Sequence, residues 1–237
     1  MRLTVIGCSP AWPNPGGSQS GYLVESGGRL LLDCGPGVLA RLRSEDLVGV
    51  DAIAITHFHL DHCGDLIPWA WFLKHAPVAT TPPMPVLWLP PKGKEELARF
   101  ARFWGVPSMF EDVFDVAEFE SSRRVSAAGF ELEALPVPHY GMTAYGFRVH
   151  DRDGRILAYS GDSAPSEQLE RVARGADLFL CEATLASGDD DSDPRGHLSA
   201  EEAIAAADGP VLLTHRPGEL PAPAGARLAY DGLVLEV

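Results

Sequence analysis

The chain has 237 residues, of which 46% are hydrophobic and 22% charged, a composition typical of soluble globular proteins. This length suits one domain, which we expect to span residues 1–237. The 33 acidic and 19 basic residues give a formal net charge of −14, which disfavours a long nucleic acid as the substrate. No apolar run reaches the roughly 18 residues that cross a bilayer, and residues 1–7 lack the features of a secretion signal. We therefore expect a cytoplasmic protein with no membrane partner.

The first half of the chain alternates short apolar runs with glycine-rich turns, a pattern that predicts strands. We expect strands at residues 3–6, 22–25, 30–33, 51–55 and 86–89. Longer amphipathic or apolar segments predict helices at residues 38–43, 66–75 and 94–104. The strand at 51–55 is the one that matters for function, because a dense group of polar side chains follows it directly.

That group lies in the segment Thr56-His-Phe-His-Leu-Asp-His-Cys-Gly-Asp65, which contains three histidines and two aspartates. His57 and His59 are two residues apart, so on an extended backbone their side chains point the same way. Asp61 and His62 follow where the chain must turn before the next helix. Imidazole and carboxylate are typical zinc ligands, so these four side chains predict a metal site for one or two ions.

The second half repeats the alternation of strands and helices. We expect strands at residues 131–137, 144–149, 155–160, 177–181, 210–213 and 232–237. A helix is predicted at 166–174, and another begins at Ser199, with Glu202 at capping-box spacing. Titratable side chains follow these strands or precede these helices at His139, Asp162, Glu182, His197 and His215. Each is unremarkable alone, but together they favour one shared site.

The order of the predicted elements indicates an α/β (α+β) protein. Strands are followed by helices and then by strands again, twice along the chain. Two sheets packed face to face with helices outside, a four-layer αββα sandwich, satisfy this order. The polar residues in the loops would then converge at one edge of the sandwich.

The motif His57-x-His59-x-Asp61-His62, followed by His139, Asp162 and His215, resembles the complete ligand set of the metallo-β-lactamase superfamily. The resemblance covers essentially the whole chain. It implies the αββα fold of that family and two Zn²⁺ ions, with Mn²⁺ or Fe²⁺ as alternatives.

The resemblance also implies a role for each ligand. One metal would be held by His57, His59 and His139, the other by Asp61, His62 and His215, with Asp162 bridging them. A hydroxide that bridges the metals would be the nucleophile, and Asp61 would also orient it. Asp33 would fix the tautomer of a ligand histidine from outside the site.

Three further motifs are similar to the phosphodiesterase branch that includes ribonuclease Z. They are Gly161-Asp162-Ser163, Glu182-Ala183-Thr184 and His197-Leu198-Ser199. In that branch the extra histidine assists the leaving oxygen, and His197 matches it. Glu182 would orient His197, although a carboxylate at a strand end can also simply cap a helix.

The substrate is suggested by what lies between two of the ligands. Ribonuclease Z enzymes commonly carry a tRNA-binding arm between the residues matching His139 and Asp162, and here only residues 140–161 separate them. The segments Gly7-Cys-Ser-Pro10 and Tyr159-Ser-Gly-Asp162 also resemble a group of actinobacterial cyclic-nucleotide phosphodiesterases. We therefore expect a small, cyclic or linear, nucleotide phosphodiester as the substrate.

Three other interpretations stay open at this point. The chain could be a ribonuclease Z-type tRNA 3′-processing endonuclease, or a lactone or thioester hydrolase that uses the same metals. It could also be a metal-free binding module, which the full ligand set argues against. A homodimer is a further expectation, with the aromatic segments 69–72 and 100–104 as its interface unless they belong to the core.

Overall fold

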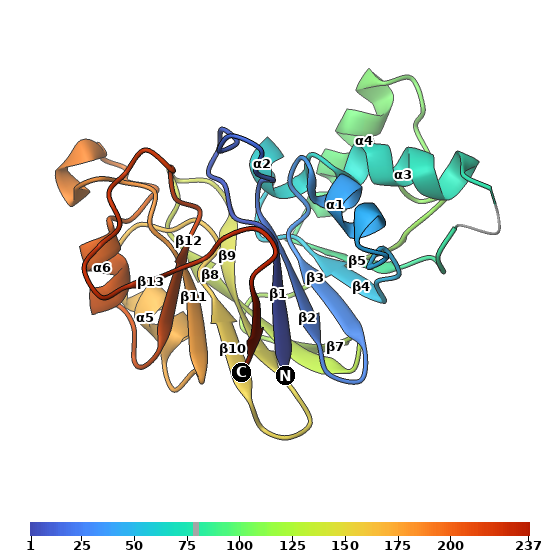
Figure 1. Ribbon diagram of the computed structural model, residues 1–237. Helices are drawn as coiled ribbons and strands as arrows, with labels where there is room; N and C mark the ends of the chain where they lie inside the picture. Colours follow the sequence, from blue (N-terminus) through green and yellow to red (C-terminus); the bar gives the residue numbers. More distant parts are fainter. Residues whose placement is uncertain (78–80) are drawn as a thin grey trace.

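The computed structural model describes residues 1–77 and 81–237 and contains two seven-stranded sheets (Figure 1). The first sheet has the order β14-β1-β2-β3-β4-β5-β6. Its strands are β1 Arg2–Gly7, β2 Gly21–Glu25, β3 Arg29–Leu32, β4 Ala52–Ala54, β5 Val86–Leu89, β6 Asp115–Glu118 and β14 Val234–Glu236. Strands β3 to β6 run parallel, so β3 and β4 end at the same edge of the sheet.

The second sheet has the order β13-β12-β11-β10-β9-β8-β7. Its strands are β7 Arg124–Ala127, β8 Phe130–Val137, β9 Ala144–His150, β10 Ile156–Tyr159, β11 Leu178–Glu182, β12 Val211–Thr214 and β13 Arg227–Leu228. Strands β10, β11 and β12 are parallel, and β9 is antiparallel to both β8 and β10. The C-terminal ends of β8, β10, β11 and β12 therefore meet at one edge.

Three hydrophobic clusters hold the layers together. The central cluster joins the inner faces of the two sheets, with Tyr22 and Leu32 from the first sheet packing with Phe147 and Tyr159 from the second. Because side chains alternate along a strand, the outward-facing residues form the other two clusters with the helices. This arrangement confirms the α/β sandwich that the order of elements predicts.

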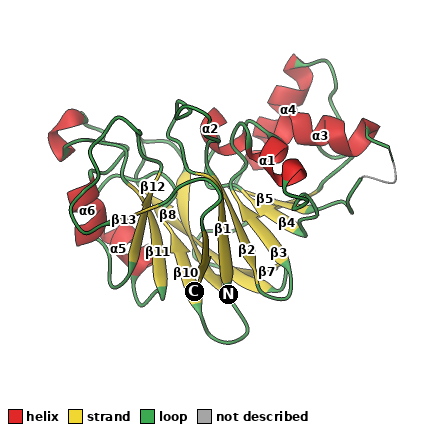
Figure 2. Cartoon of the chain, in the orientation of Figure 1, coloured by secondary structure: helices red, strands yellow, loops and turns green. Residues whose placement is uncertain are grey.

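The helices cover the outer faces of the sheets (Figures 1 and 2). On the first sheet lie α1 Val38–Ser44, α3 Leu66–His75 and α4 Gly93–Phe103, and on the second lie α5 Glu167–Ala173 and α6 Ala200–Ala205. The short helix α2, Leu60–Cys63, lies at the edge where the loops gather. The predicted capping box of Ser199 and Glu202 is present at the start of α6.

Five elements of the described residues were not expected from the sequence: α2, β6, β7, β13 and the short 3-10 helix η2, Gly188–Asp190. Each has four residues or fewer and too little periodicity to identify by pattern. The single turn of α2 means that the histidine and aspartate motif at residues 57–62 is part extended and part helical. His59 has an extended backbone, whereas Asp61 and His62 lie on the helical turn.

Each aromatic segment has a buried and an exposed part. Trp69 is fully buried in the cluster between α3 and the first sheet, so it belongs to the core, whereas Trp71 is 40% exposed. Phe103 and Trp104 are 80% and 55% exposed at the end of α4. A homodimer through that end stays a prediction. None of the helices within 1–77 and 81–237 has the length and apolarity needed to span a membrane.

Candidate metal centre

Three imidazole nitrogens from two loops converge at the edge of the sandwich. His57 and His59 follow β4, and His139 follows β8. His59 Nδ1 lies 3.1 Å from His57 Nε2 and 3.0 Å from His139 Nε2. Oδ2 of Asp162, which follows β10, lies 3.8 and 3.9 Å from the same two Nε2 atoms. These four residues could hold one divalent cation.

A second group of four faces the other oxygen of the same carboxylate. Asp162 Oδ1 lies 3.2 Å from His62 Nε2 and 3.7 Å from His215 Nε2. Asp61 Oδ2 lies 3.0 Å from His215 Nε2 and 3.5 Å from His62 Nε2. These residues could hold a second cation. Asp162 thus stands between the two groups, with one oxygen directed at each.

The nitrogen and oxygen atoms that face one another in these two groups are arranged to bind a cation rather than to form hydrogen bonds with each other. His139 Nδ1 donates to the carbonyl oxygen of Gly196 at 2.7 Å, so its Nε2 carries a lone pair. His57 Nδ1 similarly contacts Thr56 Oγ1 at 3.0 Å. Both Nε2 lone pairs then point at the same place. In the second group, His62 Nε2 and Asp162 Oδ1 are buried without a hydrogen-bond partner among the described residues, as expected for atoms that hold a cation.

The electrostatics of the two groups also suit divalent cations. Burial lowers the pKa of His57 well below its ordinary value and also lowers that of His139, so both rings are neutral ligands at pH 7. For His62 burial acts the same way, but the carboxylates of Asp162 and Asp33 outweigh it and raise the pKa well above the ordinary value. The negative potential that favours a proton on His62 equally favours a metal ion there.

Asp33 supports the second group from behind. His62 Nδ1 donates to Asp33 Oδ2 at 2.7 Å, which leaves Nε2 facing Asp162. The same carboxylate accepts hydrogen bonds from the backbone N–H of Thr56 at 2.8 Å and the Tyr159 hydroxyl at 2.8 Å. Asp33 is therefore where the sequence places it, against a histidine of the candidate site. Its backbone has a φ of 58°, a conformation that aspartate tolerates better than most residues.

The turn after Asp33 packs directly on the ligand motif. Cys34 N–H donates to the carbonyl oxygen of His62 at 2.7 Å. A Cβ atom on Gly35 would lie 2.0 Å from the carbonyl oxygen of Asp61, so only glycine fits at this position. These backbone contacts hold the single turn of α2 and hence the directions of Asp61 and His62.

His197 lies beside the first group and is held by Glu182. Its Nδ1 donates to Glu182 Oε1 at 2.9 Å and lies 3.9 Å from Asp162 Oδ2. Burial alone would lower the pKa of His197, but the charges of Glu182 and Asp162 outweigh it and raise the pKa to about 9. The ring is therefore protonated at pH 7, which is the state a proton donor requires.

Glu182 is fully buried, and its other partners are also near the site. It accepts hydrogen bonds from Ser163 N at 3.0 Å and Thr184 Oγ1 at 2.7 Å. None of its partners lies in a helix, so the helix-capping alternative for this carboxylate is not what the structure shows. Glu182 orients His197, and with His215 these two form a third group whose potential ligand atoms lie within 4.8 Å of one another.

Thr56, Thr184 and Tyr159 also contact the site, and pattern analysis gives them no role. Thr184 Oγ1 accepts a hydrogen bond from His215 Nδ1 at 2.9 Å and donates to Glu182, linking the two. Thr56 connects His57 to Asp33 in the same way. Each lies within or next to a motif that the sequence reveals, and that position is the signal that could have identified it.

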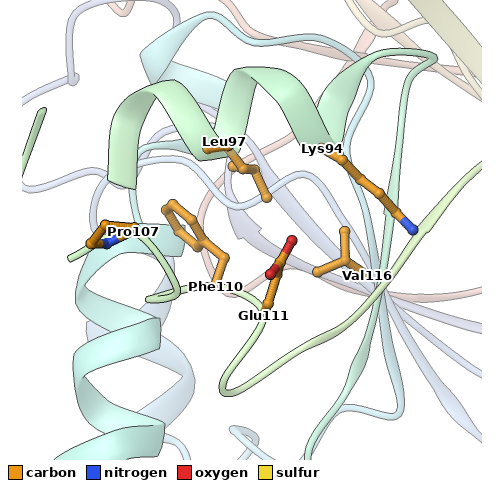
Figure 3. A pocket seen from close by; sticks show the side chains of 7 residues that line it. Lys94, Leu97, Pro107, Phe110, Glu111 and Val116 are labelled. Carbon is orange, nitrogen blue, oxygen red and sulfur yellow. The ribbon is translucent and has the colours of Figure 1, made fainter. Parts of the chain in front are cut away.

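A small cavity lies between α4 and the segment 107–116 and is lined by Leu97, Phe110 and Val116 among others (Figure 3). Its volume of about 20 Å³ accommodates a water molecule but not a substrate. None of its lining residues belongs to the two groups described above. The candidate site is identified by the converging histidines and aspartates at the edge of the sandwich, and not by a cavity.

The chain is similar in sequence to a known family and to several known proteins. The family described as "Beta-lactamase superfamily domain" matches residues 28–210. An uncharacterized protein of Mycobacterium leprae is 35% identical over 92% of this chain and 78% of its own length. The probable metallo-hydrolase YhfI of Bacillus subtilis is 30% identical over 92% of this chain and 87% of its own.

Solved structures share the fold. The crystal structure of YhfI superposes with a TM-score of 0.82, at 24% identity and 99% coverage of both chains. The human short-form tRNase Z superposes with a TM-score of 0.77, at 22% identity, over 100% of this chain and 99% of that one.

Proposed function

Because the chain belongs to the beta-lactamase superfamily and is a metal-dependent hydrolase of that fold, we propose that it holds two zinc ions and hydrolyses a small phosphodiester such as a cyclic or linear nucleotide. The observation that carries this proposal is the position of Asp162. Its two oxygens face two separate groups of ligands, and a histidine held by a buried glutamate lies beside them.

In this proposal each residue at the edge of the sandwich has a distinct task. His57, His59 and His139 would hold one ion and Asp61, His62 and His215 the other, with the carboxylate of Asp162 available to both. Two zinc ions would supply an activated water and neutralise charge on the phosphate. Asp61 orients the attacking water, and Asp33 keeps the proton of His62 on Nδ1 so that Nε2 can bind metal.

His197 is the proposed general acid. Its Nδ1 proton is engaged by Glu182, so the proton available for transfer is the one on Nε2. A phosphodiester with an alkoxide leaving group needs this proton, because an alkoxide is a poor leaving group. Glu182 acts as a positioning residue that holds the ring and stabilises its charge. The carboxylate is fully buried and accepts hydrogen bonds from Ser163, Thr184 and His197, which supports this role over direct chemistry.

The surroundings of the site support a small substrate. The segment 140–161 is occupied by β9, β10 and the turn that joins them, which leaves no inserted arm for a tRNA. The two arginines nearest the site in sequence are engaged by protein atoms: Arg195 pairs with Glu202 at 2.8 Å, and Arg216 donates to the carbonyl oxygen of Ala183 at 3.1 Å. The loop 188–193 adds four aspartates. A long polyanion would meet repulsion there.

The test combines metal analysis with a panel of substrates. We expect about two zinc ions per chain and hydrolysis of bis-p-nitrophenyl phosphate and cyclic AMP. Both metal content and hydrolysis should fall in His57→Ala. The exposed His75 at the end of α3 provides the matched control, and His75→Ala should change neither. A zinc-loaded wild type that hydrolyses no phosphodiester would refute the proposal.

Ribonuclease Z activity is the second candidate. The superposition on human tRNase Z over the whole chain favours it, although at 22% identity that likeness concerns the fold. Cleavage of precursor tRNA at low salt, with a rate above that on cyclic AMP, would select this function. The variant His197→Ala distinguishes a lactone or thioester hydrolase from a phosphodiesterase. It should hardly change the rate of hydrolysis when the leaving group needs no acid.

A further inference from the structure

Tyr140, directly after His139, adopts an unusual backbone conformation. Its φ is 46°, in the left-handed region that residues other than glycine rarely occupy. Such a conformation is unfavourable and persists only when the surroundings fix it. Here the backbone N–H of Tyr140 donates to the carbonyl oxygen of Arg195 at 3.2 Å, on the loop that carries His197. The strained residue thus joins the two loops that bring His139 and His197 together.

The backbone conformation places the aromatic ring over the site. The ring centroid lies 4.9 Å from that of His139 and 5.4 Å from that of His197. Gly196 makes room for it, since a Cβ atom there would lie 2.3 Å from the ring. Even so, Tyr140 is 44% exposed. One part of the ring therefore packs in a prepared position, and the remainder is open to a molecule bound at the site.

The loop that surrounds the ring is also held in place. The carboxylate of Asp191 accepts the backbone N–H of Gly196 at 2.8 Å and of His197 at 3.3 Å. An aromatic ring with two rotatable side-chain bonds, packed against Gly196 and two histidines, loses little entropy when a ligand packs against it. This preorganisation is typical of a recognition surface.

We propose that Tyr140 determines specificity by forming an aromatic wall on the leaving-group side of the site, where it stacks on a planar group of the substrate. The inference rests on the proposed function, in which the leaving oxygen takes its proton from His197. A leaving group beside His197 must pass the ring that contacts His197. In a nucleotide the planar group would be the base, because every base offers a flat π-face to an aromatic side chain.

Two phosphate monoesters of similar size test this wall. Phenyl phosphate has a flat ring and cyclohexyl phosphate a puckered one, and calorimetric titration of zinc-loaded protein compares their affinities without any turnover. We expect the wild type to bind phenyl phosphate about fivefold or more tightly, the lower end of what stacking contributes. Tyr140→Leu should bring the ratio close to one, whereas Tyr140→Phe should keep it.

The variants separate stacking from a purely structural role. If Tyr140→Phe loses the preference as fully as Tyr140→Leu, the phenol hydroxyl is responsible and the stacking wall is refuted. Gly196→Ala is a second probe that retains Tyr140 but displaces its ring, and it should also lose the preference. It remains informative if Tyr140→Leu does not fold.

Other outcomes are equally decisive. A wild-type ratio near one, a ratio kept in Tyr140→Leu or in Gly196→Ala, or no binding of either phosphate would overturn the inference. Hydrolysis of bis-p-nitrophenyl phosphate by the same preparation tests the proposed function separately. Hydrolysis without the affinity ratio would refute only the role of Tyr140, whereas a ratio without hydrolysis would refute the phosphodiesterase.

Discussion

The two sheets contribute to the candidate metal centre in opposite ways. The first sheet supplies its ligand atoms from one stretch, residues 57–62, directly after β4. The second sheet supplies single residues from four separate strand ends, and these are His139, Asp162, Glu182 and His215. Asp162 and Asp61 both contact His215, so the second cation group already combines the two sheets. The comparison shows that a motif of neighbouring residues in the first sheet is joined by single residues of the second sheet, which only the order of the strands brings close to it.

The largest effect is expected for Asp162, because its carboxylate faces both groups of candidate ligands. Asp162→Ala removes the carboxylate that faces both groups and leaves four buried imidazoles without it. We expect hydrolysis of bis-p-nitrophenyl phosphate to fall by more than about 1,000-fold, beyond the 10- to 100-fold typical of residues outside the first shell. Plasma mass spectrometry should show fewer than two metal ions per chain. Full metal content with normal turnover would contradict a bridging role.

A smaller effect should follow from removing the proposed general acid, His197, because all the candidate metal ligands stay in place. His197→Ala should lower hydrolysis of an alkyl phosphodiester by about 100- to 10,000-fold, the range found for general acids. The loss should be smaller for bis-p-nitrophenyl phosphate, because p-nitrophenolate leaves without a proton. Metal content is the control and should equal that of the wild type. Equal losses on both substrates would argue against proton donation.

The pH dependence of kcat/KM tests the role of Glu182. Its charge helps raise the pKa of His197 to about 9, so the acid remains protonated, and active, up to that pH. Glu182→Gln removes the charge and should move the alkaline limb of kcat/KM to lower pH. If the pKa returned to its ordinary 6.5, activity at pH 8 would fall by about thirtyfold relative to the plateau at low pH. An unchanged alkaline limb would show that another group sets it.

The smallest effect concerns the contact between the sheets behind the site. The Tyr159 hydroxyl, on β10, donates to Asp33, at the end of β3. Tyr159→Phe should lower the free energy of unfolding by about 1.5–3 kcal/mol, the range for a hydrogen bond to a charged group. Urea unfolding measures this change. Metal content should stay the same, because His62 keeps its bond to Asp33, and a loss of metal would show that Tyr159 tunes the ligand itself.

Prediction from sequence succeeded where the signal is local. Helix α3 and strand β5 have the expected bounds, because apolar runs between clear turn residues define them. The turn of α2 was missed, since its few local hydrogen bonds are supplemented by contacts with Cys34 and Gly35 from a distant turn. Strand β7 was missed because pairing with β8, and not its own composition, makes it a strand.

The sequence by itself determined the side chains available to the candidate site: the histidines and aspartates of residues 57–62 and the titratable residues at later strand ends. The order of the elements also indicated the sandwich. A side chain's identity and its distance to near neighbours along the chain are local properties. Only the tertiary structure decided that the two oxygens of Asp162 face different groups, and that Glu182 contacts His197 and caps no helix. The position of Tyr140 over His139 and His197 also depends on it. Those facts are distances between segments far apart in the chain, and strand order and packing determine such distances.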